Sequence, residues 1–215
     1  MVVGTQLNAE DLAKRRNYKY VNRVTLKSNL AACMLRKAGN LLEPRPGARL
    51  LDMFCGSGTV LLEWSALVNG ERKGERVPIE AVGIDVSLGA VEGARANAEA
   101  EGAAADCRFI KCDAKAMRSQ LEDGSFDAIV TNVPWGVQTG NDAKVDLEKL
   151  YEMVLRNAWH LLRPKGRVVF LVHAASFPAL PRPLGACPAG LGADLSAAGV
   201  PAGAARAAAA ADLAA

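Results

Sequence analysis

Apolar residues recur along this chain with two periods, one typical of helices and one typical of strands. Residues 28–42 place them at the spacing of one helical face, namely Leu30, Met34, Leu35, Ala38 and Leu42. Segments of the two kinds then alternate, with strands expected at 48–54, 79–85, 107–113, 126–133 and 166–174 and helices at 59–68, 88–100 and 147–162. This alternation predicts an α/β fold with a Rossmann-like, doubly wound and mainly parallel sheet.

The last 42 residues differ in composition from the rest. They hold 18 Ala, five Pro and five Gly with few large apolar side chains, so they cannot bury enough surface to fold compactly. We therefore expect three parts, which are a basic N-terminal segment at 1–24, one folded domain at 25–173 and a disordered tail at 174–215.

Positive charge is concentrated at the front of the chain. Residues 1–49 hold ten Lys and Arg against three Asp and Glu, a net +7, which leaves −4 for the remainder of a chain whose total is +3. Within that front, residues 14–23 interleave cations with Tyr18 and Tyr20, a composition suited to phosphate contacts and base stacking. A solvated linker or a helix face explains the same residues equally well.

Several classes of protein are disfavoured. No uninterrupted apolar run approaches the roughly 20 residues that span a bilayer, and the N-terminus lacks the apolar core of a signal peptide. The five cysteines form no C-x-x-C pair, and Cys107 and Cys112 would face opposite sides of a strand. We expect a protein of the cytoplasm or nucleus with no membrane contact, no metal and no disulfide framework.

The first strand runs into Asp52 and then into a turn that contains Cys55, Gly56 and Gly58 before the next helix. Glycine lets the backbone approach a ligand closely where a side chain would obstruct it. A dinucleotide fingerprint would need a third glycine where this chain has Leu61, so we expect a ligand without a pyrophosphate.

Two more carboxylates end the next two strands. Asp85 can accept hydrogen bonds from both hydroxyls of a ribose, while Ser87 caps the following helix. Asp113 and the backbone amide of Ala114 suit the amine and a ring nitrogen of adenine. Because the carboxyl ends of parallel strands share one rim, these groups should surround one ligand.

The fourth strand ends in Asn132, and Val133, Pro134, Trp135 and Gly136 follow it. An exocyclic amine on a nucleic-acid base is a poor nucleophile because its lone pair is delocalised into the ring. The side-chain oxygen of Asn132 and the carbonyl of Val133 can accept the two amine hydrogens. Trp135 can stack on the base, and Pro134 stiffens the turn. The structural alternative is a proline turn with a buried tryptophan.

Taken together, these residues resemble the family of S-adenosylmethionine-dependent RNA methyltransferases that includes the THUMP-domain tRNA guanine-N2 methyltransferases. The likeness covers roughly residues 23–173, and its most specific element is the combination of DMFCGSGT with NVPWG. The resemblance implies a class I methyltransferase domain at 25–173, S-adenosylmethionine as cofactor, and the exocyclic amine of a base in RNA as acceptor. The leading expectation is guanine N2 in tRNA.

The resemblance also implies roles for single residues. Cofactor binding would fall to Asp52, Cys55, Gly56, Gly58, Asp85, Asp113 and Ala114. Asn132, Pro134 and Trp135 would hold the target base and align its amine.

This sequence departs from the family pattern in three ways. Val133 stands where related motifs commonly have proline, at a position that contributes its carbonyl. We expect no THUMP-like domain before the catalytic part, so RNA affinity should come from the basic front or from an activating partner protein, or be lost. The alanine-rich tail stands in place of the two strands that usually complete the sheet, so we expect a sheet without them.

Two other functions stay open. The same Asn-x-Pro-aromatic arrangement serves methylation of adenine or cytosine amines in DNA. An inactive cofactor-binding or RNA-binding subunit, or a fragment, would also keep the fold. Methylation of a small molecule is least favoured, because it leaves residues 132–135 and the basic front without a role.

Overall fold

The computed structural model describes residues 16–22, 24–39, 41, 44–70, 74–135 and 146–172. Four of the expectations above concern positions outside the described residues. These are the tail at 174–215, most of the basic segment, residues 173–174 of the last expected strand, and Gly136.

Five strands form one parallel sheet in the order β3-β2-β1-β4-β5. Their bounds are β1 (Ala48–Asp52), β2 (Ile79–Asp85), β3 (Cys107–Lys111), β4 (Phe126–Asn132) and β5 (Leu162–Leu171). The chain builds outward from β1 to β3 and then returns to place β4 on the other side of β1. The order therefore reverses between β1 and β4, which is the point where ligands bind in such sheets. The predicted doubly wound parallel fold is confirmed.

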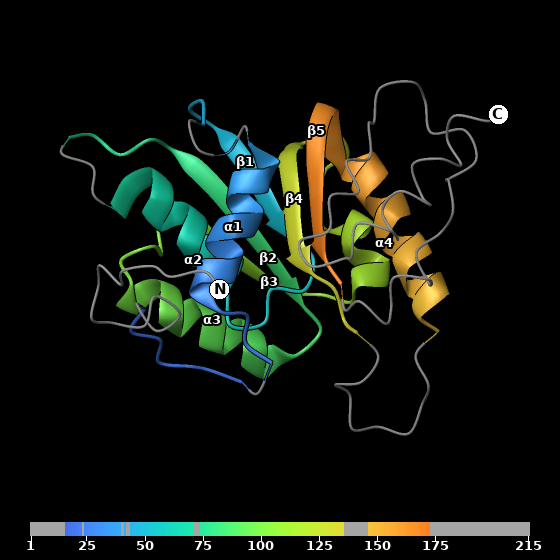
Figure 1. Ribbon diagram of the computed structural model, residues 1–215, viewed down its shortest axis with the longest axis horizontal. Coiled ribbons are helices and arrows are strands. Elements are labelled where there is room, and N and C mark those ends of the chain that lie inside the picture. The colour runs from blue at the N-terminus through green and yellow to red at the C-terminus, as the bar shows by residue number, and fades with distance from the viewer. Residues whose placement is uncertain are drawn as a thin grey trace, which may run out of the picture.

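Helices cover both faces of the sheet (Figure 1). One face carries α1 (Ser28–Ala38), α2 (Thr59–Ser65) and α3 (Leu88–Ala100), and the other carries the 3-10 helix η3 (Ala114–Ser119) and α4 (Leu147–Leu161). A π-helical turn, η2 (Ala66–Gly70), continues α2. Each layer of helices encloses its own apolar core against the sheet.

Several element boundaries differ from the expectation. Strands β1 and β3 end two residues earlier than expected, at Asp52 and Lys111, and β4 and α4 each end one residue earlier. The first helix ends at Ala38, because Gly39 adopts a φ of 69° and its N–H turns back to the carbonyl of Arg36. The helix expected at 59–68 is divided between α2 and η2. The last strand begins at Leu162 rather than at residue 166, because Leu162 already pairs with Phe126.

Alternating side chains of the strands divide between the two cores. Leu50 of β1 packs with α1 and α2, whereas its neighbour Leu51 packs with α4. Cys107 and Cys112 divide in the same way, as the sequence predicts. The carboxyl ends of the central strands are thus held between two packed layers.

Residues 16–22 precede α1 and lie along α2 and α3, where Figure 1 shows them as a blue trace beside α3. Their side chains alternate in exposure. Arg16, Tyr18, Tyr20 and Asn22 are partly buried, and Asn17, Lys19 and Val21 are exposed. The two tyrosines that suit base stacking therefore pack against their own protein.

Candidate functional site

The polar residues singled out from the sequence gather at one rim of the sheet. Asp52, Asp85 and Asn132 end β1, β2 and β4, and Asp113 follows β3. Because all five strands are parallel, these four positions lie at the same edge, across the switch point between β1 and β4.

Asp52 is the most buried carboxylate of this rim, with 2% of its surface exposed. Both hydrogen bonds that it accepts fall on Oδ1, from the hydroxyl of Thr131 at 2.6 Å and from the N–H of Phe54 at 3.1 Å. Burial raises the pKa of Asp52 to about 7 against the opposing effect of these two donors, and the charge of Asp85 adds to the rise. Near neutral pH, Asp52 therefore gains or loses its proton readily.

A tight glycine turn follows Asp52. Gly56 and Gly58 have φ values of 51° and 83°, in the left-handed region that favours glycine. A Cβ at Gly58 would also lie 3.1 Å from the ring of Phe109, so the turn is pressed closely onto β3. Gly58 is buried against β3, whereas Gly56 is partly exposed and has no side chain that would obstruct a ligand.

Asp85 fastens this turn to the end of β2. Its Oδ2 accepts a hydrogen bond from the N–H of Gly56 at 3.0 Å, and its Oδ1 accepts one from the N–H of Ser87 at 2.8 Å. Ser87 caps α3 as expected, with its hydroxyl accepting from the N–H of Ala90. Asp85 is thus already oriented by the protein, and a carboxylate retains acceptor capacity for further donors.

Asp113 and Ala114 begin the short helix η3, an element that the sequence analysis did not predict. Oδ1 of Asp113 accepts from the N–H of Lys115 at 2.9 Å and caps η3, and the carboxylate is exposed. Ala114 is buried, and its carbonyl accepts a hydrogen bond from Asn157 of α4 at 2.9 Å. Helix α4 thus positions the start of η3.

The turn after β4 carries an unpaired acceptor. Oδ1 of Asn132 is buried, and no residue in the described part of the chain donates a hydrogen bond to it. Such an atom is costly unless it has a partner. The N–H of Val133 donates to the carbonyl of Leu171 at 3.2 Å, which ties the turn to the end of β5.

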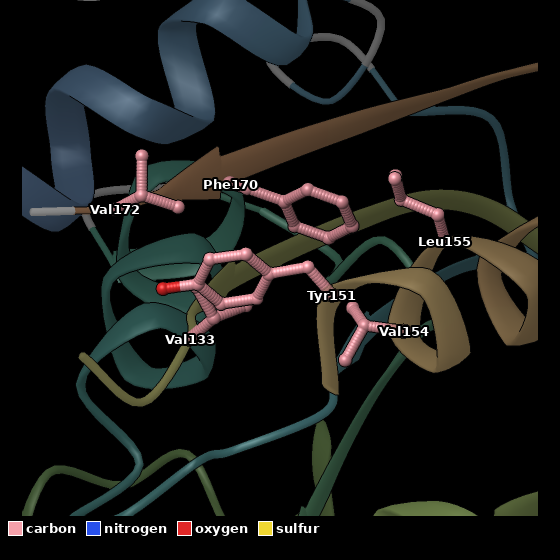
Figure 2. Close-up of a pocket in the computed structure, with 6 residues that line it drawn as sticks. All are labelled: Val133, Tyr151, Val154, Leu155, Phe170 and Val172. Carbon is pink, nitrogen blue, oxygen red and sulfur yellow. The ribbon is translucent and has the colours of Figure 1, made fainter. Parts of the chain in front are cut away.

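Tyr151 of α4 supports the same turn through a hydrogen bond. Its hydroxyl donates to the carbonyl of Pro134 at 3.2 Å, and only 2% of the residue is exposed. Figure 2 shows its ring in an apolar recess between α4 and β5, which is lined by Val133, Tyr151, Val154, Leu155, Phe170 and Val172. Trp135 follows and is partly buried. The recess fixes the turn but offers no polar group to a ligand.

Cys55 lies between the two carboxylates of β1 and β2 and is 5% exposed. Burial raises the pKa of its thiol well above the ordinary value, and the negative charges of Asp52 and Asp85 raise it further. The thiol stays protonated at any physiological pH.

Three residues of this region escaped the sequence analysis. Thr131 donates to Asp52, Tyr151 supports Pro134, and Asn97 of α3 donates to the carbonyl of Ser57 in the glycine turn at 3.0 Å. Asn97 had a detectable signal, because it continues the apolar face of Ala90 and Ala94 at helical spacing and is fully buried.

Two features are absent from the part of the chain that the structure describes. Its His, Cys, Asp and Glu side chains form no group of three that could hold a metal ion. None of its helices has both the length and the apolar character needed to cross a bilayer.

A model of the RMKL-like methyltransferase domain matches residues 15–179 of this chain. Among curated relatives, the tRNA (guanine(6)-N2)-methyltransferase of Thermus thermophilus is 36% identical over 79% of this chain and 45% of that protein. The tRNA (guanine(10)-N2)-dimethyltransferase of Methanothermobacter thermautotrophicus is 35% identical over 67% of this chain and 37% of that protein. The chain thus spans less than half the length of these two relatives.

Solved structures agree on the fold. The crystal structure of TrmN from Thermus thermophilus superposes with a TM-score of 0.57 at 33% identity, over 74% of this chain and 42% of that chain. A possible methylase from Clostridium difficile superposes with a TM-score of 0.55 at 24% identity, over 77% of this chain and 48% of that chain.

Proposed function

The chain belongs to the family of RMKL-like methyltransferase domains, and we propose that it transfers a methyl group from S-adenosylmethionine to the exocyclic N2 amine of a guanine in tRNA. The observation that carries the proposal is the buried Oδ1 of Asn132, which has no hydrogen-bond donor among the described residues and belongs to the last residue of β4, at the same edge of the sheet as Asp52 and Asp85.

S-adenosylmethionine is the cofactor of this fold, and it supplies an electrophilic methyl group whose bond to sulfur breaks as a bond to the acceptor nitrogen forms. The residues of the rim fit it. We call Asp52, residues 55–58, Asp85, Asp113 and Ala114 the cofactor side. In our proposal Asp85 accepts from the ribose hydroxyls, and Asp113 and the N–H of Ala114 recognise adenine. The open backbone at Gly56 accommodates the methionine part.

Asp52 would face the ammonium group of the methionine part. Its Oδ1 is occupied by Thr131 and Phe54, so Oδ2 is the oxygen that remains for a ligand. A cation beside a buried carboxylate favours its charged form. Since the pKa of Asp52 is about 7, cofactor binding should be accompanied by release of a proton from this side chain near neutral pH.

We call residues 132–135 the acceptor side. In our proposal Oδ1 of Asn132 and the carbonyl of Val133 accept the two hydrogens of the guanine amine, which turns its lone pair toward the methyl group. Trp135 stacks on the base, and Tyr151 keeps the turn in place through Pro134. Once the nitrogen has attacked, it carries an extra proton, which passes to solvent. Positioning of this kind is the main contribution that these residues offer, since none of them needs to act as a base.

The choice of tRNA rests on the two curated relatives, which are named for guanine-N2 methylation of tRNA. Exposed cations in the front segment, such as Lys19, would contribute contacts to phosphates. An activating partner protein or further domains would supply the remaining affinity for RNA.

Transfer of radiolabelled methyl groups tests the proposal. The full chain is incubated with labelled S-adenosylmethionine and either unmodified tRNA or duplex DNA, and labelled nucleosides are identified after digestion. We expect N2-methylguanosine from tRNA and no label in DNA. Label in DNA alone, or at another base of tRNA, would contradict the proposed acceptor. No label in either, while a full-length relative labels the same tRNA, would favour the inactive subunit.

A further inference from the structure

Residues 16–22, which we call the clasp, are anchored to the domain at their first residue. The guanidinium of Arg16 forms an ion pair at 2.8 Å with Glu63 of α2, a side chain with no exposed surface, and a second at 3.4 Å with Glu101. The N–H of Asn17 donates to Glu101 at 2.8 Å. A buried carboxylate is costly without a partner, so Arg16 is held firmly between Glu63 of α2 and Glu101 at the end of α3.

Tyr20, in the middle of the clasp, packs closely against α3 at Gly93. A Cβ built on Gly93 would lie 2.2 Å from Cγ of Tyr20, which is the base of the ring and not its flexible end. A side chain at Gly93 would therefore force Tyr20 to shift. Gly89, in the same helix, offers a contrast, because a Cβ there would have only the Ser87 hydroxyl within reach, at 3.9 Å.

Asn97 joins the clasp to the glycine turn. Its Oδ1 accepts from the N–H of Tyr20 at 2.8 Å, and its Nδ2 donates to the carbonyl of Tyr20 at 2.8 Å and to the carbonyl of Ser57 at 3.0 Å. Both ends of one amide are thus fixed by the clasp, and the remaining donor is directed at the turn. Few side chains could make all three bonds at once.

The bond to Ser57 fixes a peptide plane of the turn. The carbonyl of Ser57 and the N–H of Gly58 belong to the same peptide unit, and that N–H donates to the carbonyl of Cys55 at 2.8 Å. The carbonyl of the unit is therefore held by Asn97, and its N–H is held by Cys55. The side chain of Asn22 lies nearby, with its amide nitrogen 3.9 Å from where a Cβ on Gly56 would be.

We propose that the clasp is a working part of the cofactor site, and that Gly93 and Asn97 are positioning residues through which clasp docking and cofactor binding stabilise each other. A shift of Tyr20 that moves its backbone removes the two bonds that orient the Asn97 amide, so the peptide unit between Ser57 and Gly58 loses a support and the turn loosens. By linkage, a cofactor that requires the ordered turn must tighten the clasp by the same factor. The inference rests on the S-adenosylmethionine site and not on the RNA acceptor.

Two alanine variants in one helix test this inference. Gly93→Ala should weaken binding of S-adenosylhomocysteine, measured by calorimetry, by about tenfold, the effect of losing roughly one ordered hydrogen bond. Gly89→Ala should bind within about twofold of the wild type. Alanine favours helix over glycine, so a lower affinity in Gly93→Ala at an unchanged or higher unfolding temperature would not reflect general destabilisation. Equal affinity of Gly93→Ala and the wild type would overturn the proposal.

A double variant tests whether the effect of Gly93→Ala passes through the ring of Tyr20. When Tyr20→Ala has already removed the ring, Gly93→Ala should cause no further loss of affinity, and a further tenfold loss would overturn the proposed route through Tyr20. A second measurement needs only the wild-type protein. S-adenosylhomocysteine should slow amide hydrogen exchange in a peptide covering residues 16–22, and unchanged exchange at saturating ligand would contradict the linkage. Absence of binding would overturn the cofactor site as well, whereas normal binding without RNA methylation would leave this inference standing.

Discussion

On the cofactor side of the rim, Asp52, Asp85 and Asp113 each accept hydrogen bonds from the protein itself. On the acceptor side, Oδ1 of Asn132 is buried and accepts none from the described residues. The first set of groups is already oriented before any ligand arrives, while the second retains an unsatisfied acceptor. A site that binds its cofactor first and aligns a base afterwards would have this asymmetry, because unsatisfied acceptors are kept for the partner that must be recognised.

The largest effect should follow from removing the unsatisfied acceptor on the acceptor side. Asn132→Ala should lower methyl transfer to tRNA by about a hundredfold or more, because a misplaced amine loses its near-attack geometry. Affinity for S-adenosylhomocysteine should stay within about twofold, since the cofactor side is untouched. Single-turnover transfer and calorimetry measure the two effects. Transfer at the wild-type rate would exclude Asn132 from amine alignment.

Asp85→Ala should have the opposite pattern of effects, with weaker cofactor binding and little change in methyl transfer at saturating cofactor. It removes an acceptor for the ribose and the bond to Gly56, so cofactor affinity should fall by roughly tenfold to a hundredfold. At saturating cofactor, methyl transfer should largely recover, because the acceptor side is intact. The KM for S-adenosylmethionine and kcat separate the effects, and a fall confined to kcat would argue against a cofactor role.

A smaller effect is expected at the support of the acceptor side. Tyr151→Phe keeps the ring in its recess but loses the hydrogen bond to the carbonyl of Pro134, at a cost of about 1 kcal/mol in unfolding free energy. We expect kcat to fall by about threefold to tenfold through looser positioning of the turn. Cofactor affinity is the internal control, and a change there would contradict independence of the two sides.

The smallest effect concerns the proton on Asp52. Because its folded-state pKa is raised to about 7 from 3.8, its contribution to stability is full at low pH and is lost as the pH rises through 7. The unfolding free energy of the wild type, relative to Asp52→Asn, should therefore fall by about 1 kcal/mol between pH 6 and pH 8. Urea unfolding at the two pH values measures the difference. A pH-independent difference would show that Asp52 does not titrate in this range.

Most of the fold followed from periodicity, because β2 and α3 begin and end where their apolar patterns begin and end. The rim followed as well, since a carboxylate at a strand end is visible in sequence and parallel strands share an edge. Residues that support the site through contacts with other elements could not be predicted from the sequence in the same way. Nothing local marks Tyr151 as the partner of the Pro134 carbonyl, because the contact joins α4 to a turn after β4.

The front segment shows the same limit from another side. Its composition suits contacts to RNA and a solvated linker equally well, but the alternation of exposure places Tyr18 and Tyr20 against the domain and leaves Lys19 outside. Composition cannot distinguish a tyrosine that stacks on a base from one that packs on a helix. Gly93, far along the chain, leaves the space that the ring of Tyr20 occupies. The sequence alone does not link these two residues, because only the structure shows them in contact.

The thiol of Cys55 has a practical consequence for chemical probes. It lies within the glycine turn, yet burial and two neighbouring carboxylates hold its pKa well above the ordinary value. Maleimides and acrylamides react with thiolates, so a cofactor-like inhibitor bearing such a warhead should fail to form a covalent bond here. Among the described cysteines, Cys33 of α1 is exposed, and a fluorophore attached there would report on the helix beside the clasp while the thiol of Cys55 stayed unlabelled.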